Sequence, residues 1–114
     1  MHKLLAALAA PLLLGFAAPA YTQAWPSKPI RYICNFAPGG TTDILARLIA
    51  PKLSDALGQP VVVENKPGQA GSVGAAELAR AAPDGYTIGS GTISSHGLNT
   101  ALYAKLPYDV LKDF

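Results

Sequence analysis

The chain has 114 residues, half of them hydrophobic, and its 9 Lys and Arg residues against 7 Asp and Glu residues leave a formal net charge of +2. This near-neutral balance argues against a nucleic-acid-binding protein, which needs a basic surface facing the phosphates. The single cysteine excludes an internal disulfide, and no close cluster of metal ligands is evident, so neither a metal nor a cofactor is expected.

Residues 1–24 have the character of a secretory signal peptide. Lys3 supplies the positive start, Leu4 to Phe16 is almost entirely Leu and Ala, and small residues follow. The apolar stretch is too short to remain as a membrane span. We therefore expect export to the periplasm, cleavage after Ala24, and no stable membrane insertion afterwards. A cleavage site after Ala20, or an uncleaved anchor or buried helix, is the alternative.

Residues 25–114 alternate between strand and helix patterns. Runs rich in β-branched and aromatic residues predict strands over Ile30 to Phe36, Val61 to Glu64 and Tyr86 to Ser90. Apolar residues at helical spacing predict helices from Thr42 to Leu57 and from Val73 to Ala82, with a short helical segment from Leu98 to Tyr103. This alternation predicts an α/β fold with a βαβαβ parallel sheet. The unbroken valines after Pro60 also predict a strand buried on both faces.

The first predicted helix has recognisable ends and one irregularity. Thr41 or Thr42 is available as the N-cap, and Gly58 is placed to end the helix. Pro51 lies inside it, where it removes one amide and collides with the carbonyl of Arg47. We therefore expect a kink or a break at Pro51.

The loop between the first strand and this helix, Phe36-Ala37-Pro38-Gly39-Gly40-Thr41-Thr42-Asp43, has the features of a ligand site. Adjacent glycines let backbone amides approach a ligand with no Cβ in the way, and the first helical turn presents unsatisfied amides at the positive end of the dipole. The loop lacks the lysine of a Walker motif and the spacing of a dinucleotide fingerprint. The sequence therefore predicts an anion site that suits a carboxylate better than a polyphosphate.

Few residues in the chain could perform catalysis. No nucleophile elbow follows any predicted strand, which argues against a hydrolase. His96, near Ser94 and Ser95, could face a ligand, although a lone loop histidine more often caps nearby backbone. Asp43 could enter the crevice, but its place in the first helical turn favours satisfying amides there. Cys34 is expected to be a small buried residue in a strand.

Several short motifs follow one another in order. They are Trp25-Pro26-Ser27-Lys28-Pro29-Ile30, Phe36-Ala37-Pro38-Gly39-Gly40 with Asp43, Leu57-Gly58-Gln59-Pro60-Val61-Val62-Val63-Glu64-Asn65, Pro67-Gly68, Ala82-Pro83-Asp84-Gly85-Tyr86-Thr87, and Leu106-Pro107-Tyr108-Asp109 with Lys112-Asp113-Phe114. With these motifs the chain resembles the extracytoplasmic solute receptors of tripartite tricarboxylate transporters, the Bug family. It departs from them at Cys34-Asn35, where such receptors usually carry an apolar residue and proline.

The resemblance implies a two-lobed, periplasmic binding protein-like (type II) fold without catalytic activity. Such a receptor closes on a small carboxylate, which could be a dicarboxylate, tricarboxylate, amino acid or aromatic acid, and delivers it to two membrane subunits. Residues 25–114 would be the N-terminal portion of the first lobe, with the second lobe absent, so weak binding or none is expected. The implied ligand-binding residues are Ala37, Pro38, Gly39, Gly40, Thr41, Thr42 and Asp43 in the first loop, and Thr92, Ser94, Ser95 and His96 in the loop after the third strand.

Three questions stay open at this point. Asn35 could donate a hydrogen bond to the ligand or only satisfy the loop backbone. A phosphate-binding or nucleotide-binding α/β enzyme fragment could use the same loop. A non-functional remnant is the third alternative.

Overall fold

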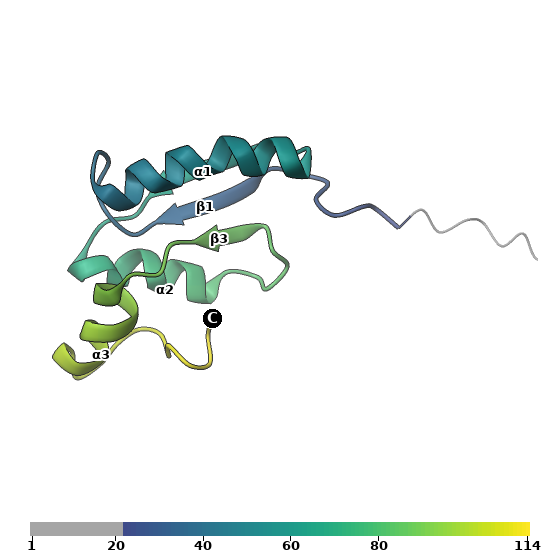
Figure 1. Cartoon of the computed structure of the whole chain (residues 1–114). Helices are drawn as coiled ribbons and strands as arrows, with labels where there is room; N and C mark the ends of the chain where they lie inside the picture. The colour runs from purple at the N-terminus through teal and green to yellow at the C-terminus, as the bar shows by residue number, and fades with distance from the viewer. Residues whose placement is uncertain (1–21) are drawn as a thin grey trace, which may run out of the picture.

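The computed structural model describes residues 22–114, so the predicted signal peptide lies almost wholly outside the described residues. The elements, in chain order, are β1 (Ile30–Cys34), α1 (Thr41–Leu57), β2 (Val61–Asn65), the 3-10 turn η1 (Gln69–Gly71), α2 (Ser72–Arg80), β3 (Thr87–Gly89), the π-helical turn η2 (Ser94–Leu98) and α3 (Asn99–Leu102). Figure 1 shows their arrangement. Within residues 22–114, no helix combines the length and the apolar character needed to cross a membrane.

The three strands form one parallel sheet in the order β2-β1-β3. The register pairs Ile30 with Val61 on one side of β1, and Arg31 with Thr87 on the other. The βαβαβ parallel arrangement predicted from the sequence is therefore confirmed. Each strand is shorter at one or both ends than the apolar pattern suggested, except β2, which extends to Asn65.

Helices α1 and α2 pack on opposite faces of this sheet (Figure 1). On the α1 face, Ala50 packs against Ile30 and Val61 in a buried cluster. On the α2 face, Gly89 of β3 lies so close to Leu78 that an added Cβ would come within 2.8 Å of the leucine Cδ2. The sheet is thus the middle layer of a three-layer α/β/α unit, and all the strands end at the same edge.

The exposure of β2 corrects one sequence prediction. Val62 is 49% exposed, although the valine run predicted burial on both faces. The reason is strand order, because β2 lies at the edge and α2 packs on β1 and β3 instead of covering it. Only the α1 face of β2, which carries Val61 and Val63, contributes to the core.

Helix α1 corrects two more predictions. It runs without a break through Pro51, because this proline is exposed while Ala50 before it and Leu53 after it pack in the core against the sheet. Its N-cap is Gly40, with no side-chain cap, so neither Thr41 nor Thr42 has the predicted capping role. Gly58 ends the helix as predicted, at a left-handed φ of 71°.

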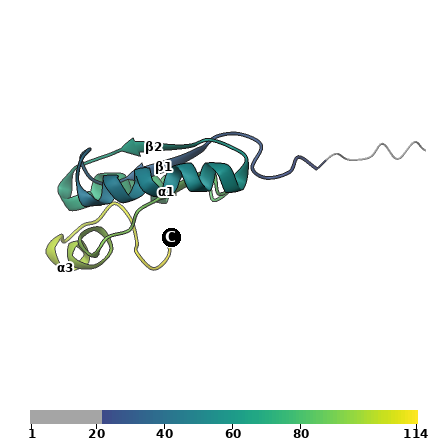
Figure 2. The same cartoon turned by 45° about the horizontal axis from the view of Figure 1, so that its top comes forward.

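The two ends of the described chain fold back onto the unit. Near the start, Trp25 lies with its ring centroid 5.9 Å from that of Tyr86, and the amide of Ser27 donates to the Tyr86 hydroxyl at 2.8 Å. Near the end, Tyr108 is buried against Ala75 and Ala76 on the outer side of α2. Figure 2 shows this final segment and α3 on the side of the molecule away from α1.

Candidate functional site

Three loops meet where the parallel strands end, as the sheet topology predicts. Phe36 follows β1, Gly71 follows β2, and Ser95 follows β3. A Cβ on Gly71 would lie 3.1 Å from the Phe36 ring and 3.2 Å from the Ser95 Cβ, and Gly71 has a φ of +88°. Glycine is therefore required for the loops to approach this closely.

A cavity of about 370 Å³ opens beside this junction, between the first and third loops. Its lining is Phe36, Gly40, Thr41, Thr42, Thr92, Ile93 and Ser94. Five of these seven are residues that the family resemblance implied: Gly40, Thr41, Thr42, Thr92 and Ser94. The other predicted residues, Ala37, Pro38, Gly39, Asp43, Ser95 and His96, do not line it.

Phe36 and Ile93 are the lining residues that sequence reasoning missed. Apolar residues occur throughout a folded protein, so the residue type alone did not identify either of them as part of a ligand site. Ile93 is 80% exposed, however, and lies among Gly, Ser and Thr residues that do not form a core. An isolated aliphatic residue in a polar loop is the signal that could have identified it.

The amino-terminal end of α1 presents free backbone donors to this cavity. The amide of Ile44 is the first to bond within the helix, at 2.9 Å from the Gly40 carbonyl oxygen. Within residues 22–114, the amides of Thr41, Thr42 and Asp43 have no acceptor. They lie at the positive end of a 17-residue helix, which favours a bound anion.

The loop sequence suggested that the amides of Gly39 and Gly40 would be free to bind a ligand, but both approach acceptors within the loop. The Gly39 amide donates to Asp43 Oδ2 at 2.9 Å, so it is satisfied within the loop. The Gly40 amide lies 3.5 Å from the Ala37 carbonyl oxygen, at the limit of a hydrogen bond. Among the residues at this end of α1 that line the cavity, the free amides are therefore those of Thr41 and Thr42, which follow the two glycines in the chain.

Asp43 holds the loop instead of entering the cavity. The residue is 4% exposed, and its carboxylate accepts hydrogen bonds from the Gly39 amide, from Asn65 Nδ2 at 2.9 Å and from Arg47 Nε at 3.0 Å. These donors, with the Gly39 amide first, lower the pKa of Asp43 to about 2. The interpretation of Asp43 as a residue that satisfies local amides is the one that the geometry supports.

The third loop contains its own reciprocal cap. The Ser95 amide donates to Thr92 Oγ1 and the Thr92 amide donates to Ser95 Oγ, both at 3.1 Å. Ser95 is fully buried, and its Oγ lies 2.8 Å from His96 Nδ1. The His96 ring packs 4.6 Å from that of Phe114, centroid to centroid. Ser95 and His96 therefore support the loop, while Thr92 and Ser94 reach the cavity.

The two unusual residues at the end of β1 are structural. Asn35 is fully buried and its Nδ2 donates to the Ser90 carbonyl oxygen at 2.8 Å, so it satisfies loop backbone. Cys34 is buried, as expected for a small residue in a strand. Among the described residues, no group of three or more His, Cys, Asp or Glu residues is placed to hold a metal.

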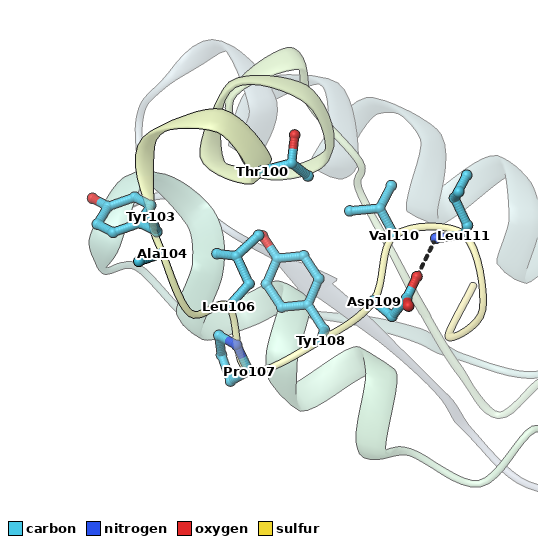
Figure 3. Close-up of a pocket in the computed structure, with 9 residues that line it drawn as sticks. All are labelled: Thr100, Tyr103, Ala104, Leu106, Pro107, Tyr108, Asp109, Val110 and Leu111. Atoms are coloured by element: carbon cyan, nitrogen blue, oxygen red, sulfur yellow. Dashed lines mark hydrogen bonds between the residues drawn. The ribbon is translucent and has the colours of Figure 1, made fainter.

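A second, more open hollow of about 650 Å³ lies in the carboxyl-terminal segment (Figure 3). Its lining is Thr100, Tyr103, Ala104, Leu106, Pro107, Tyr108, Asp109, Val110 and Leu111. The Asp109 carboxylate at its rim accepts a hydrogen bond from the Leu111 amide at 2.9 Å. Because it carries a carboxylate and none of the predicted site residues, this hollow is the poorer anion site.

The chain was also compared with known protein families, curated proteins and solved structures. Residues 45–114 match the tripartite tricarboxylate transporter family receptor, TctC. The chain is 43% identical to protein BugT of Bordetella pertussis over 100 residues, which cover 87% of this chain and 31% of BugT. The chain therefore spans about a third of the length of this curated relative.

Solved structures show the same fold. One, described as a periplasmic transporter, is 56% identical with a TM-score of 0.76, over 78% of this chain and 30% of that chain. MatC from Rhodopseudomonas palustris, with bound malate, is 43% identical with a TM-score of 0.74, again over 78% of this chain and 30% of that chain. The chain belongs to the tripartite tricarboxylate transporter receptor family.

Proposed function

We propose that this protein is a periplasmic receptor that captures a small organic acid for a tripartite tricarboxylate transporter. The observation that carries the proposal is the pair of free amides at Thr41 and Thr42, two residues that line a cavity between two loops. These amides would hold one carboxylate of the ligand. The family membership and the malate bound to the relative MatC support this assignment.

The lining of the cavity explains why a carboxylate is the favoured guest. No charged side chain lines it, so the negative charge would be balanced by the α1 dipole and by hydrogen bonds. The hydroxyls of Thr42, Thr92 and Ser94 supply further donors. Phe36 and Ile93 would contact the carbon chain of the ligand. The volume of about 370 Å³ is within the usual range of small-molecule sites.

The wider assembly is also part of the proposal. Residues 1–24 would direct export and be removed, and two membrane subunits would accept the solute. A second lobe would close over the cavity and bind the far end of the ligand. BugT supports this division, because the matching residues account for 31% of its length. The contacts described here come from one α/β unit, so we expect this unit by itself to bind the carboxylate weakly.

Nuclear magnetic resonance can test the proposal at the level of single amides. The whole chain, exported with its own amino-terminal segment and labelled with nitrogen-15, would be titrated with malate, succinate and citrate. We expect the amide signals of Thr41 and Thr42 to shift in a saturable manner, with a smaller change at Gly39 because its amide is already bonded. Malamide, in which both carboxylates are replaced by amides, is the matched neutral control.

Two results would contradict the proposal. Thr41 and Thr42 could respond to none of the three acids, which would reject a carboxylate site at this helix end. Alternatively, inorganic phosphate or a nucleotide could shift them at concentrations where the acids do not. That result would favour the rival nucleotide-binding or phosphate-binding enzyme.

A further inference from the structure

Asn65 is the residue at which β2 meets the loop that carries the proposed site. It is the last residue of β2 and is paired in register with Cys34 at the end of β1. Its side chain therefore lies beside the chain as it leaves β1 and enters the loop. This inference rests on the proposed function, because it concerns the positioning of the amides that would bind the ligand.

The side-chain amide of Asn65 contacts both ends of that loop. Its Nδ2 donates to the Phe36 carbonyl oxygen at 3.0 Å, where the loop begins, and to Asp43 Oδ1 at 2.9 Å, where α1 has begun. Its Oδ1 accepts a hydrogen bond from Arg47 Nη2 at 3.0 Å, one helical turn later. Both hydrogens of the Nδ2 group and one lone pair of Oδ1 are thus in use.

The loop has little internal support of its own. Between Phe36 and the first helical bond, the contacts are the Gly39 amide to Asp43 and the long 3.5 Å approach of the Gly40 amide to the Ala37 oxygen. Ala37, Pro38, Gly39 and Gly40 are all exposed, so packing does not fix them either. The bridge through Asn65 is what ties the loop to the neighbouring strand.

The chemistry of the bridge selects asparagine. An aspartate of the same shape would place a carboxylate against the Phe36 carbonyl oxygen and the Asp43 carboxylate, with no hydrogen to donate to either. An alanine would remove the donor and acceptor together. Only a neutral amide of this length donates to two oxygens on one side and accepts from a guanidinium on the other.

We propose that Asn65 is a positioning residue that sets the distance between Phe36 and the first turn of α1, and so aims the Thr41 and Thr42 amides into the cavity. It does not line the cavity, so it would not contact a ligand bound there. Its effect on binding passes through Asp43 and the loop backbone.

The test compares Asn65→Ala, Asn65→Asp and a matched control, Ser54→Ala, in the whole chain. Ser54 also links α1 to β2, because its Oγ accepts the Val61 amide at 2.8 Å, but it lies far from the loop, near the end of α1. Malate affinity is measured from the Thr41 and Thr42 amide shifts, and stability from denaturant unfolding. We expect affinity to fall about tenfold or more in both Asn65 variants and to be unchanged in Ser54→Ala, since hydrogen bonds to charged groups are among the stronger ones.

The Asn65→Asp variant adds a second readout, the pH dependence of malate affinity, which a simple loss of stability would not produce. The new carboxyl would face the Asp43 carboxylate, and like charges this close raise the pKa of one group strongly. Once protonated, the new side chain regains a hydrogen to donate. We therefore expect malate affinity of Asn65→Asp to recover as the pH falls from about 8 to about 6, whereas the parent chain and Asn65→Ala stay flat. Arg47, the other charged partner of this side chain, keeps its charge throughout and opposes part of this rise in pKa, equally at every pH in the range.

The outcomes separate this inference from the function on which it rests. If the parent chain binds malate and the Asn65 variants bind equally well, the inference is wrong and the function stands. The inference also fails if all three variants lose affinity in proportion to stability. If the parent chain binds none of the acids, the proposed function fails first. If Asn65→Asp does not fold, the malate affinity of Asn65→Ala compared with that of Ser54→Ala decides whether the inference holds.

Discussion

The carboxylate of Asp43 lies 2.9 Å from the backbone nitrogen of Gly39, four residues before it in the chain. The loop therefore closes on itself through a charge-assisted hydrogen bond before any ligand arrives. Because Asp43 takes the Gly39 amide, the free donors begin at Thr41. Arg47 Nε donates to the same carboxylate at 3.0 Å and offsets its negative charge.

The first prediction concerns acid stability. The pKa of Asp43 is lowered from 3.8 to about 2 in the folded chain. A carboxyl with a depressed folded pKa stabilises the fold above its unfolded pKa, and this contribution is lost as the pH falls toward the folded value. We expect the melting temperature of Asp43→Asn to depend less on pH between about 4 and 2 than that of the parent chain. Thermal melts across this range measure it, with Asp55→Asn, on an exposed part of the same helix, as the control. Identical pH profiles for Asp43→Asn and the parent would contradict the assignment.

The second prediction concerns the close approach of α2 to the end of β1. A Cβ on Gly74 would lie 2.7 Å from Asn35 Oδ1 and 3.0 Å from the Lys66 carbonyl oxygen, and the latter is backbone that cannot rotate away. We expect Gly74→Ala to lower the free energy of unfolding by about 1–3 kcal/mol, the usual cost of overpacking. Denaturant unfolding measures it. Gly97→Ala is the matched control, because its added Cβ would meet no atom closer than 4.0 Å; equal effects at both glycines would refute the packing explanation.

The third prediction concerns the support under the third loop. The buried hydroxyl of Tyr108 donates a hydrogen bond to the Ser95 carbonyl oxygen, which lies in η2. Removing the hydroxyl leaves this buried oxygen without that donor. We expect Tyr108→Phe to destabilise the chain by about 1–2 kcal/mol, measured by chemical denaturation. Tyr103→Phe, at a position that is 41% exposed, should change little. An unchanged free energy of unfolding in Tyr108→Phe would show that this hydrogen bond does not contribute to stability.

The fourth prediction concerns the aliphatic residue that lines the cavity. Ile93 lines the cavity but is 80% exposed in the free chain, so it contributes little to stability. We expect Ile93→Ser to weaken malate binding about fivefold, because covering part of an aliphatic side chain contributes about 1 kcal/mol. Leu111→Ser, at a side chain that is 92% exposed and outside this cavity, is the control for lost surface hydrophobicity. Unchanged affinity for malate in Ile93→Ser would remove Ile93 from the site.

The layered fold could be predicted because its signals are local. The apolar spacing after Thr42 and the valines at the start of β2 each indicate one element without knowledge of the others. The exposure of Val62 could not be predicted in this way, because it depends on strand order and on which strands α2 covers. The continuous path of α1 through Pro51 likewise depends on packing of Ala50 and Leu53 against the sheet.

The cavity lies between the two loops that the sequence pointed to, but not every amide that the sequence suggested is free there. Glycine and threonine types indicate where backbone amides are accessible, and Gly40, Thr41 and Thr42 do line the cavity. Whether a given amide is free depends on the side chain that reaches it in three dimensions. The carboxylate of Asp43 takes the Gly39 amide, and Asn65, twenty-two residues later than Asp43, completes the arrangement. The types of these residues alone do not specify such contacts.

The contact between Trp25 and Tyr86 has a practical consequence for handling the protein. It fastens the start of the described chain beside the residue that precedes β3, at the end of the sheet opposite the three loops. A dye, a biotin or a surface linker attached just before Trp25 would leave the mouth of the cavity unobstructed. Immobilised in this orientation, every molecule on a sensor chip would point its cavity toward the flowing sample.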